Sequence, residues 1–332
     1  MPSARLGATE SIRVLVRTVT GLEQLVAAEL TTAGHRVIDL SKRQLVVDAG
    51  ESILSEPPQL ADDLFLIAAG VEDPGHTKAA LNTLSRQLRR HLTVPLPHRE
   101  PFAVSASYVG KRTYNRYDVE DLVGAIITER TGARYHSRRT GTPPEHRTDW
   151  RVVLDGESVH VGIRPFPAPL HRRDWRRHTV PGSLHPPVAA AMAHLAGIEP
   201  GQVVLDPFCG AGTILIEAQQ LEPDAEYVGV DHAKASLRAA ERNAAGIQWQ
   251  LGDARRPQIA ADRIVTNPPW DVRLAIGNLT PYLNSWRDVD AVVAIVNQHQ
   301  VATLTEHPAW SSRSVHDLSL AGLHPSIVVL RR

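Results

Sequence analysis

The stretch VVLDPFCGAGTILIEA, residues 203–218, decides the fold expected for this chain. Apolar residues typical of a buried strand end at an acid, Asp206, and two glycines precede a segment that favours a helix. Glycines let the backbone turn tightly and let a ligand approach it closely. Because ligands of an open α/β sheet bind outside the carboxyl ends of its strands, this turn is a candidate binding site.

Predicted strands and helices alternate from this turn to the end of the chain. Further strands are expected at AEYVGVD (225–231), IQWQLGDA (247–254), DRIVTN (262–267) and DAVVAIV (290–296), with helical segments between most of them. This alternation predicts a parallel, doubly wound sheet.

Acids close three successive strands of this region, namely Asp206, Asp231 and Asp253. An acid after the second strand suits ribose hydroxyls, and one after the third is placed to accept from an adenine amino group. Each acid alone fits equally well as the cap of the next helix. Together they favour an adenosine-type ligand, and the missing lysine of a phosphate-binding loop argues against a nucleoside triphosphate.

The fourth strand runs into NPPW, residues 267–270. A planar amino group is a weak nucleophile, so a reaction at its nitrogen needs fixed acceptors for its N–H groups. The Asn267 side chain and the Pro268 carbonyl offer such acceptors, Pro269 stiffens the turn, and Trp270 can stack on a base. The motif does not name its target, because any planar amino group meets this requirement.

The N-terminal half reads as an α/β region with antiparallel strands and few membrane or disulfide signals. The chain carries 36 basic and 36 acidic residues and one cysteine. Residues 130–177 nevertheless contain eleven arginines against five acids, which suits phosphate but also fits a solvated surface. No metal-ligand spacing and no apolar run of about 18 residues occurs, so we expect no metal, no membrane span and a cytoplasmic protein.

The motifs DPFCGAGTILIEA, GVD, GDA and TNPPW together resemble class I S-adenosylmethionine-dependent methyltransferases, most closely their RNA guanine-N2 branch. The resemblance covers residues 184–332 and implies a Rossmann-like sheet of seven strands. Members more often carry Tyr or Phe where this chain has Trp270. The cofactor-binding residues that the resemblance implies are Asp206, Pro207, Phe208, Gly210, Gly212, Thr213, Asp231, His232, Asp253 and Ala254.

SYVGKRTYNRYDVEDLVGAII, residues 107–127, resembles the THUMP domain of RNA-modifying enzymes, and VTGLEQLVAAEL resembles the ferredoxin-like segment that precedes it. The resemblance implies RNA contacts at Lys111, Arg112, Asn115, Arg116, Arg138 and Arg139. We expect a ferredoxin-like subdomain at 1–60, a THUMP domain at 61–165, a linker at 166–185 and the methyltransferase domain at 186–332.

These resemblances imply an enzyme that methylates the N2 amino group of a tRNA guanosine in the acceptor-stem region, such as position six. THUMP would hold the 3′ end of the tRNA, S-adenosylmethionine would be the cofactor, and a monomer is plausible. Alternatives are a 23S ribosomal RNA guanine-N2 methyltransferase, an adenine-N6 or protein-glutamine methyltransferase, and an inactive RNA-binding protein. The sequence leaves open the modified guanosine, the number of methyl groups and the oligomeric state.

Overall fold

A computed structural model of the chain describes residues 11–96, 100–256, 259–269, 279–320 and 322–332. These residues form two compact units. The first holds the described residues before Thr18 together with residues 30–58 and 63–170, and the second holds residues 18–29, 59–62 and 171–332.

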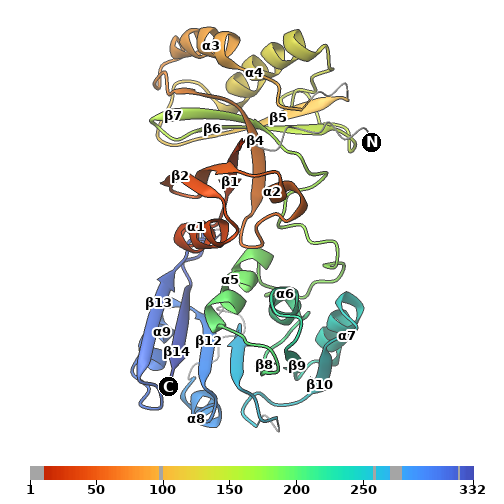
Figure 1. Ribbon diagram of the computed structural model, residues 1–332, viewed down its shortest axis with the longest axis vertical. Helices are drawn as coiled ribbons and strands as arrows, with labels where there is room; N and C mark the ends of the chain where they lie inside the picture. Colours follow the sequence, from red (N-terminus) through yellow and green to blue (C-terminus); the bar gives the residue numbers. More distant parts are fainter. Residues whose placement is uncertain (1–10, 97–99, 257–258, 270–278, 321) are drawn as a thin grey trace. The chain divides into compact units, whose positions relative to one another are not determined.

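The first unit is built on one seven-stranded sheet with the order β2-β3-β1-β4-β7-β6-β5 (Figure 1). Its strands are β1 (Ile12–Arg17), β2 (Arg36–Ser41), β3 (Gln44–Ala49), β4 (Asp63–Glu72), β5 (Phe102–Tyr108), β6 (Thr148–Leu154) and β7 (Ser158–Ile163). The helices of this part of the chain are α1 (Glu23–Thr32), α2 (Ser52–Ser55), α3 (Ala80–His91) and α4 (Arg116–Thr131). Helices α3 and α4 pack on one face of this sheet, against β4 and β5.

Strand β4 connects the two ends of this sheet. It is ten residues long, and its apolar stretch LFLIAA by itself does not distinguish a strand from a helix. This strand pairs antiparallel with β1 on one side and with β7 on the other. Strands from residues 1–60 and from residues 61–165, the two regions that the sequence analysis expects as separate domains, therefore belong to one continuous sheet.

The second unit carries the expected alternation of strands and helices. Its strands are β8 (Val203–Asp206), β9 (Glu226–Asp231), β10 (Gln248–Leu251), β11 (Arg263–Thr266), β12 (Ala291–Val296), β13 (Ser312–Asp317) and β14 (Ser326–Arg331). Its helices are α5 (Pro186–Ala196), α6 (Thr213–Leu221), α7 (Lys234–Asn243), α8 (Thr280–Ser285) and α9 (Gln298–Thr305).

The strand order of the second sheet is β10-β9-β8-β11-β12-β14-β13. The first five of these strands are parallel, and β14 pairs antiparallel with β12 on one side and with β13 on the other. The order reverses between β8 and β11, which makes that point the place where an open α/β sheet binds its ligand. The α/β fold class and the seven-stranded C-terminal sheet expected from the sequence are confirmed.

The sequence analysis expects no membrane span. Within the described ranges, no helix is both long and apolar enough to cross a membrane.

Candidate active site

The predicted site residues stand at the carboxyl ends of neighbouring parallel strands. Asp206 closes β8 and Asp231 closes β9, while Asp253 follows β10 by two residues and Asn267 follows β11 directly. Since these strands are parallel, their carboxyl ends meet at one edge of the sheet. The fold thus brings the two predicted groups, cofactor-binding and catalytic, to the same edge.

Asp206 is buried at the point where the strand order reverses. Its Oδ1 accepts hydrogen bonds from the Thr266 hydroxyl at 2.7 Å and from the Phe208 N–H at 3.0 Å. Burial raises the pKa of this carboxyl to about 7, although both hydrogen bonds favour the charged form. Asp206 therefore fixes the start of the glycine turn and ties β8 to β11.

Glycine is required at positions 210 and 212 of the turn for different physical reasons. Gly212 has φ +83°, and a Cβ there would lie 2.5 Å from the indole of Trp249, so packing excludes a side chain. Gly210 has φ +54°, and the nearest atom to its Cβ position is a Val180 methyl carbon at 3.5 Å. At Gly210 a side chain would make only an ordinary contact, so the positive φ and not packing favours glycine there.

Asp231 holds the same turn from the neighbouring strand. Its two carboxylate oxygens accept from the backbone N–H of Gly210 at 3.0 Å and of Ala233 at 2.7 Å. A carboxylate has about four acceptor positions, so these bonds orient the group and leave capacity for hydroxyls. Cys209 in the turn is buried, and burial raises its thiol pKa, which agrees with a packing role.

The remaining predicted cofactor residues differ in exposure. Asp253 is exposed and pairs with Arg255 at 2.7 Å, and hydrogen bonds from Arg255 lower the pKa of Asp253 to about 2. The His232 side chain is 84% exposed. The Ala254 carbonyl accepts from the Trp286 indole at 3.1 Å. Pro207 and Thr213 are buried beside the turn, and Phe208 packs on Tyr282 with ring centroids 5.4 Å apart.

The predicted catalytic turn begins at Asn267. Its side-chain Nδ2 donates to the Gly182 carbonyl at 3.1 Å, which fixes the plane of the amide. Pro268 is buried and Pro269 is half-buried. Trp270, the fourth predicted catalytic residue, lies outside the described residues.

Sequence reasoning missed Asn243, at the end of α7. Its Oδ1 accepts from the backbone N–H of Arg177 at 3.2 Å and of His178 at 2.9 Å. Its Nδ2 donates to the carbonyls of His178 at 2.8 Å and of Ala211 at 3.0 Å. Asn243 therefore links the segment 166–185, the expected linker and hereafter the arm, to the glycine turn. An asparagine at the end of a helix is not distinctive enough in sequence to predict this role.

The predicted RNA-binding residues fall into two groups. Lys111 is exposed, as are Arg138, Arg139 and Arg116, and the Arg116 guanidinium stacks on the ring of Tyr117 at 4.7 Å. Arg139 donates to Asp118 at 2.6 Å and to Asp121 at 2.9 Å.

Arg112 and Asn115 are occupied by the fold itself. The Arg112 side chain is 4% exposed and forms an ion pair with Asp73 at 2.5 Å. The Asn115 side chain caps α4 by accepting from the N–H groups of Tyr117 and Asp118. These two residues hold the domain together, so the sequence-based expectation of RNA contacts fits them poorly.

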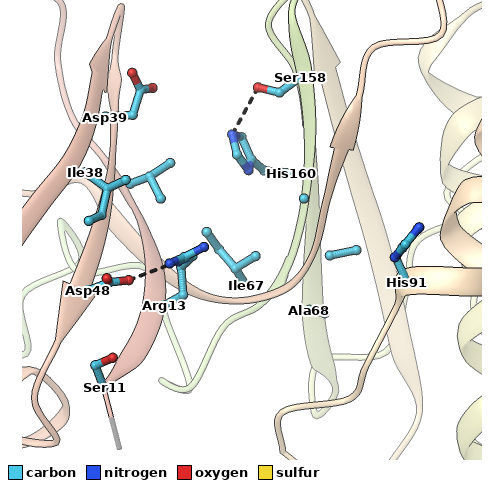
Figure 2. Close-up of a pocket in the computed structure, with 13 residues that line it drawn as sticks. Ser11, Arg13, Ile38, Asp39, Asp48, Ile67, Ala68, His91, Ser158 and His160 are labelled. Carbon is cyan, nitrogen blue, oxygen red and sulfur yellow. Dashed lines mark hydrogen bonds and ion pairs between the residues drawn. The ribbon is translucent and has the colours of Figure 1, made fainter.

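A hollow of about 640 Å³ lies in the first unit (Figure 2). Its lining includes the Arg13–Asp48 ion pair at 3.0 Å and the aliphatic Ile67. His160 contacts the Ser158 hydroxyl there at 3.3 Å. None of the predicted site residues lines this hollow.

Three side chains that could ligate a metal come together in the second unit. Ligand atoms of Asp62, His171 and His185 lie within 4.8 Å of one another. His185 Nε2 lies 2.5 Å from a carboxylate oxygen of Asp62, and His171 Nδ1 lies 3.0 Å from the Asp62 carbonyl. These contacts connect the arm to the segment before β4, and the expected absence of a metal stays a prediction.

Known proteins resemble this chain over nearly its full length. Residues 173–279 match the protein family described as RMKL-like, methyltransferase domain. The tRNA (guanine(6)-N2)-methyltransferase of Thermus thermophilus is 30% identical over 94% of this chain and 97% of its own length. A protein of the same name from Archaeoglobus fulgidus is 23% identical over 79% of this chain and 75% of its own. The crystal structure of TrmN from Thermus thermophilus matches with a TM-score of 0.81, at 26% identity, over 97% of this chain and 99% of that one.

Proposed function

We propose that this chain, which belongs to the family of tRNA (guanine-N2)-methyltransferases, uses S-adenosylmethionine to methylate the N2 amino group of a tRNA guanosine. The observation that carries the mechanism is the position of Asn267. It follows β11 at the reversal of strand order, directly after Thr266, which is bonded to Asp206. An amide suited to a planar amino group therefore stands beside the turn suited to an adenosine-type ligand.

The residues at the turn fit S-adenosylmethionine, which supplies an electrophilic methyl group when bound. The backbone of the glycine turn at Gly210 would contact the methionine part, and Asp206 lies at the base of the same turn. Asp231, already oriented by two backbone N–H groups, would accept from the ribose hydroxyls. Asp253 would accept from the adenine amino group in place of Arg255.

The chain supplies acceptors for the amino group of the base. Methyl transfer makes that nitrogen pyramidal and positively charged, so acceptors aimed at its N–H groups stabilise the transition state. We assign this role to the Asn267 side-chain oxygen and the Pro268 carbonyl. The bond from Asn267 to Gly182 fixes the amide beforehand, so little reorganisation is needed during the reaction. Stacking of Trp270 on the target base remains part of the proposal.

We propose position six of tRNA as the target. Both relatives of the family described above carry guanine(6) in their names, and one covers 97% of its own length in the comparison. The THUMP region at 61–165 would hold the 3′ end of the tRNA, while the domain at 186–332 reaches the acceptor stem. The ferredoxin-like region at 1–60 and the linker at 166–185 complete this proposed division.

The RNA contacts that we retain are the exposed cations of the THUMP region. They are Lys111, Arg116, Arg138 and Arg139. Arg112 and Asn115 are left out because a buried ion pair and a helix cap already use them.

Unmodified tRNA incubated with the protein and S-adenosylmethionine tests the proposal, with methylated nucleosides quantified by mass spectrometry. We expect N2-methylguanosine, its loss when guanosine 6 is replaced by adenosine, and a raised KM for tRNA that lacks its 3′ end. Methylation of ribosomal RNA only, of adenosine, or of a glutamine side chain would replace the substrate claim with the corresponding alternative. Cofactor binding without any transfer would indicate a protein that has kept the fold and lost the activity.

A further inference from the structure

Arg151 in the middle of β6 is a half-buried arginine whose guanidinium is held by hydroxyl groups. Its guanidinium donates to the Ser107 hydroxyl at 2.7 Å and to the Ser105 hydroxyl at 3.3 Å. Within the described ranges, no carboxylate lies within ion-pair distance of it. Two neutral hydroxyls hold this cation in place and do not neutralise it.

Opposite charges act on Arg151 from its surroundings. Burial lowers the pKa of its guanidinium, the negative charge of Asp63 counteracts this, and the positive charges of Arg138 and Arg164 lower the pKa again. Arg164 is itself bound to Asp63 at 2.6 Å and to Asp149 at 2.5 Å. The acids of this neighbourhood are thus used by another arginine, and a buried charge without a counter-ion costs free energy.

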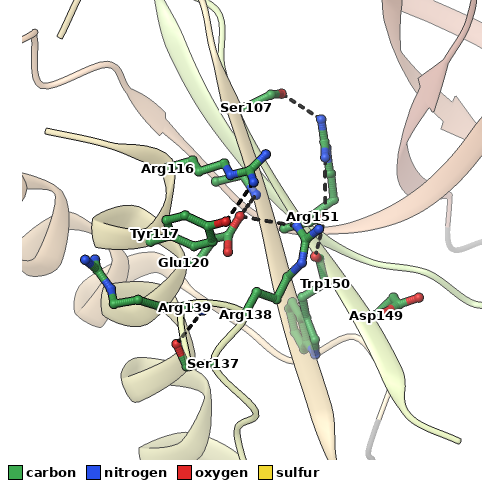
Figure 3. Close-up of polar contacts among 12 residues, drawn as sticks. Ser107, Arg116, Tyr117, Glu120, Ser137, Arg138, Arg139, Asp149, Trp150 and Arg151 are labelled. Carbon is green, nitrogen blue, oxygen red and sulfur yellow. Dashed lines mark hydrogen bonds and ion pairs between the residues drawn. The ribbon is translucent and has the colours of Figure 1, made fainter. Parts of the chain in front are cut away.

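The loop and helix beside β5 bring further cations to the same place (Figure 3). Arg138 extends toward Arg151, and Arg116 lies on the side of α4. The acid between them is Glu120, whose Oε1 accepts from the Ala106 N–H at 2.9 Å and lies 3.5 Å from Arg138. Burial raises the pKa of Glu120 above its ordinary value.

We propose that Arg151, together with Arg138 and the Ser107 hydroxyl, forms a subsite for one backbone phosphate of the substrate RNA. A planar guanidinium fork matches two oxygens of a phosphate, and a serine hydroxyl can donate to a third. The bound phosphate acts as the counter-ion of the Arg151 guanidinium. This inference rests on the proposed tRNA substrate, and it adds a residue that the sequence motifs did not single out.

The test measures binding of unmodified tRNA by fluorescence anisotropy over a series of salt concentrations, with the full-length protein. Each phosphate contact contributes about 0.7 to 0.9 to the slope of log affinity against log salt. Arg151→Gln should reduce that slope by about one contact and weaken binding about five-fold at physiological salt. Arg151→Lys should keep most of the slope, because it keeps the charge.

Arg36→Gln is the matched control. It removes one positive charge from the same unit, but Arg36 is 74% exposed and already paired with Asp48, so the slope should stay at the wild-type value. Thermal unfolding separates ligand binding from a structural role. A cation kept for a ligand destabilises the free protein, so Arg151→Gln should melt at the wild-type temperature or above it.

If Arg151→Gln keeps the wild-type slope of tRNA affinity against salt, the subsite is overturned. If the variant also melts at a lower temperature than wild type, Arg151 is a structural residue. Inorganic phosphate that stabilises wild type but not Arg151→Gln, with no change in the tRNA slope, would replace RNA by a free anion. Methylation of tRNA by the wild-type protein is scored separately. A lost slope without any methyl transfer would leave the subsite standing and remove the proposed activity.

Discussion

The hydroxyl of Thr266 donates a 2.7 Å hydrogen bond to the buried carboxylate of Asp206 across the two strands at which the strand order reverses. This bond joins the strand that precedes the catalytic turn to the strand that precedes the glycine turn. The two halves of the proposed site are thereby fixed with respect to each other before any ligand binds.

Thr266→Val should destabilise the protein and weaken cofactor binding. The substitution keeps the shape of the side chain but removes a donor from a buried acceptor, which costs about 1–3 kcal/mol. Chemical denaturation and calorimetric titration with S-adenosylmethionine measure the two effects. Thr266→Ser keeps the hydroxyl and should retain most of the affinity, and equal losses in both variants would contradict the role of this bond.

Asp206→Asn should raise the stability of the protein at alkaline pH but weaken its binding of the cofactor. The folded-state pKa of Asp206 is about 7, above the ordinary value of 3.8, so the native state binds more protons than the unfolded state between these values. The free energy of unfolding contributed by this group therefore falls as the pH rises through that window, by up to about 4 kcal/mol.

An asparagine at position 206 carries no charge and should remove this loss. The variant should be more stable than wild type at about pH 8, should show a flatter dependence of stability on pH, and should bind the cationic cofactor less tightly. Denaturation curves at several pH values and a cofactor titration give these quantities. A variant that is less stable than wild type at the alkaline end would show that the carboxylate is well compensated in the fold.

Asn267→Ala should lower kcat for tRNA methylation by about 100- to 1000-fold, because it removes an acceptor that acts in the transition state. The Kd for S-adenosylmethionine should change little. Asn297→Ala is the matched control, since Asn297 follows β12 as Asn267 follows β11 but caps α9. Comparable loss of kcat in both variants would mean that the effect is one of general stability.

Gly212→Ala and Gly210→Ala should fail in different ways. A methyl group at 212 would meet the Trp249 ring at 2.5 Å, so this variant should lose stability or fail to fold. A methyl group at 210 meets only ordinary contacts and the positive φ, which costs about 1 kcal/mol, so its main loss should be cofactor affinity. Melting temperature and cofactor Kd distinguish the two, and a folded Gly212→Ala with wild-type stability would refute the packing argument.

Arg112→Ala should reduce stability, whereas Lys111→Ala should reduce tRNA binding, although the two cations are neighbours in the sequence. Loss of Arg112 leaves the buried Asp73 without its partner, which costs about 3–5 kcal/mol. The fraction of Arg112→Ala protein that stays folded should bind tRNA with the salt dependence of wild type. Lys111→Ala should leave the denaturation midpoint unchanged and reduce the slope of tRNA binding against salt by about one contact.

Much of the catalytic region was predictable because its signals are local. A strand that ends in an acid, a turn that needs glycine and a following helix are all written within the sixteen residues 203–218. Local signals also specify the turn of the β6–β7 hairpin at Gly156 and the end of helix α4 at Gly132. In each case a positive φ or a regular alternation of side chains specifies the backbone without help from distant residues.

The sequence read alone misjudged features that depend on distant partners. Arg112 looks like a surface cation until the fold places Asp73 beside it, 39 residues away. For Gly212 the structure adds a packing reason that the sequence did not reveal, because Trp249 of β10 occupies the space that a side chain would need.

The sequence by itself determined the fold class and the order of the strand-end residues, because periodicity and turn chemistry act over a few residues. Only the tertiary structure decided which charges are neutralised. Arg139 and Arg151 read alike in the chain, yet the first pairs with Asp118 and Asp121 and the second donates to the hydroxyls of Ser105 and Ser107. Ion pairing depends on distances across strands and helices, and these exist only once the sheet has formed.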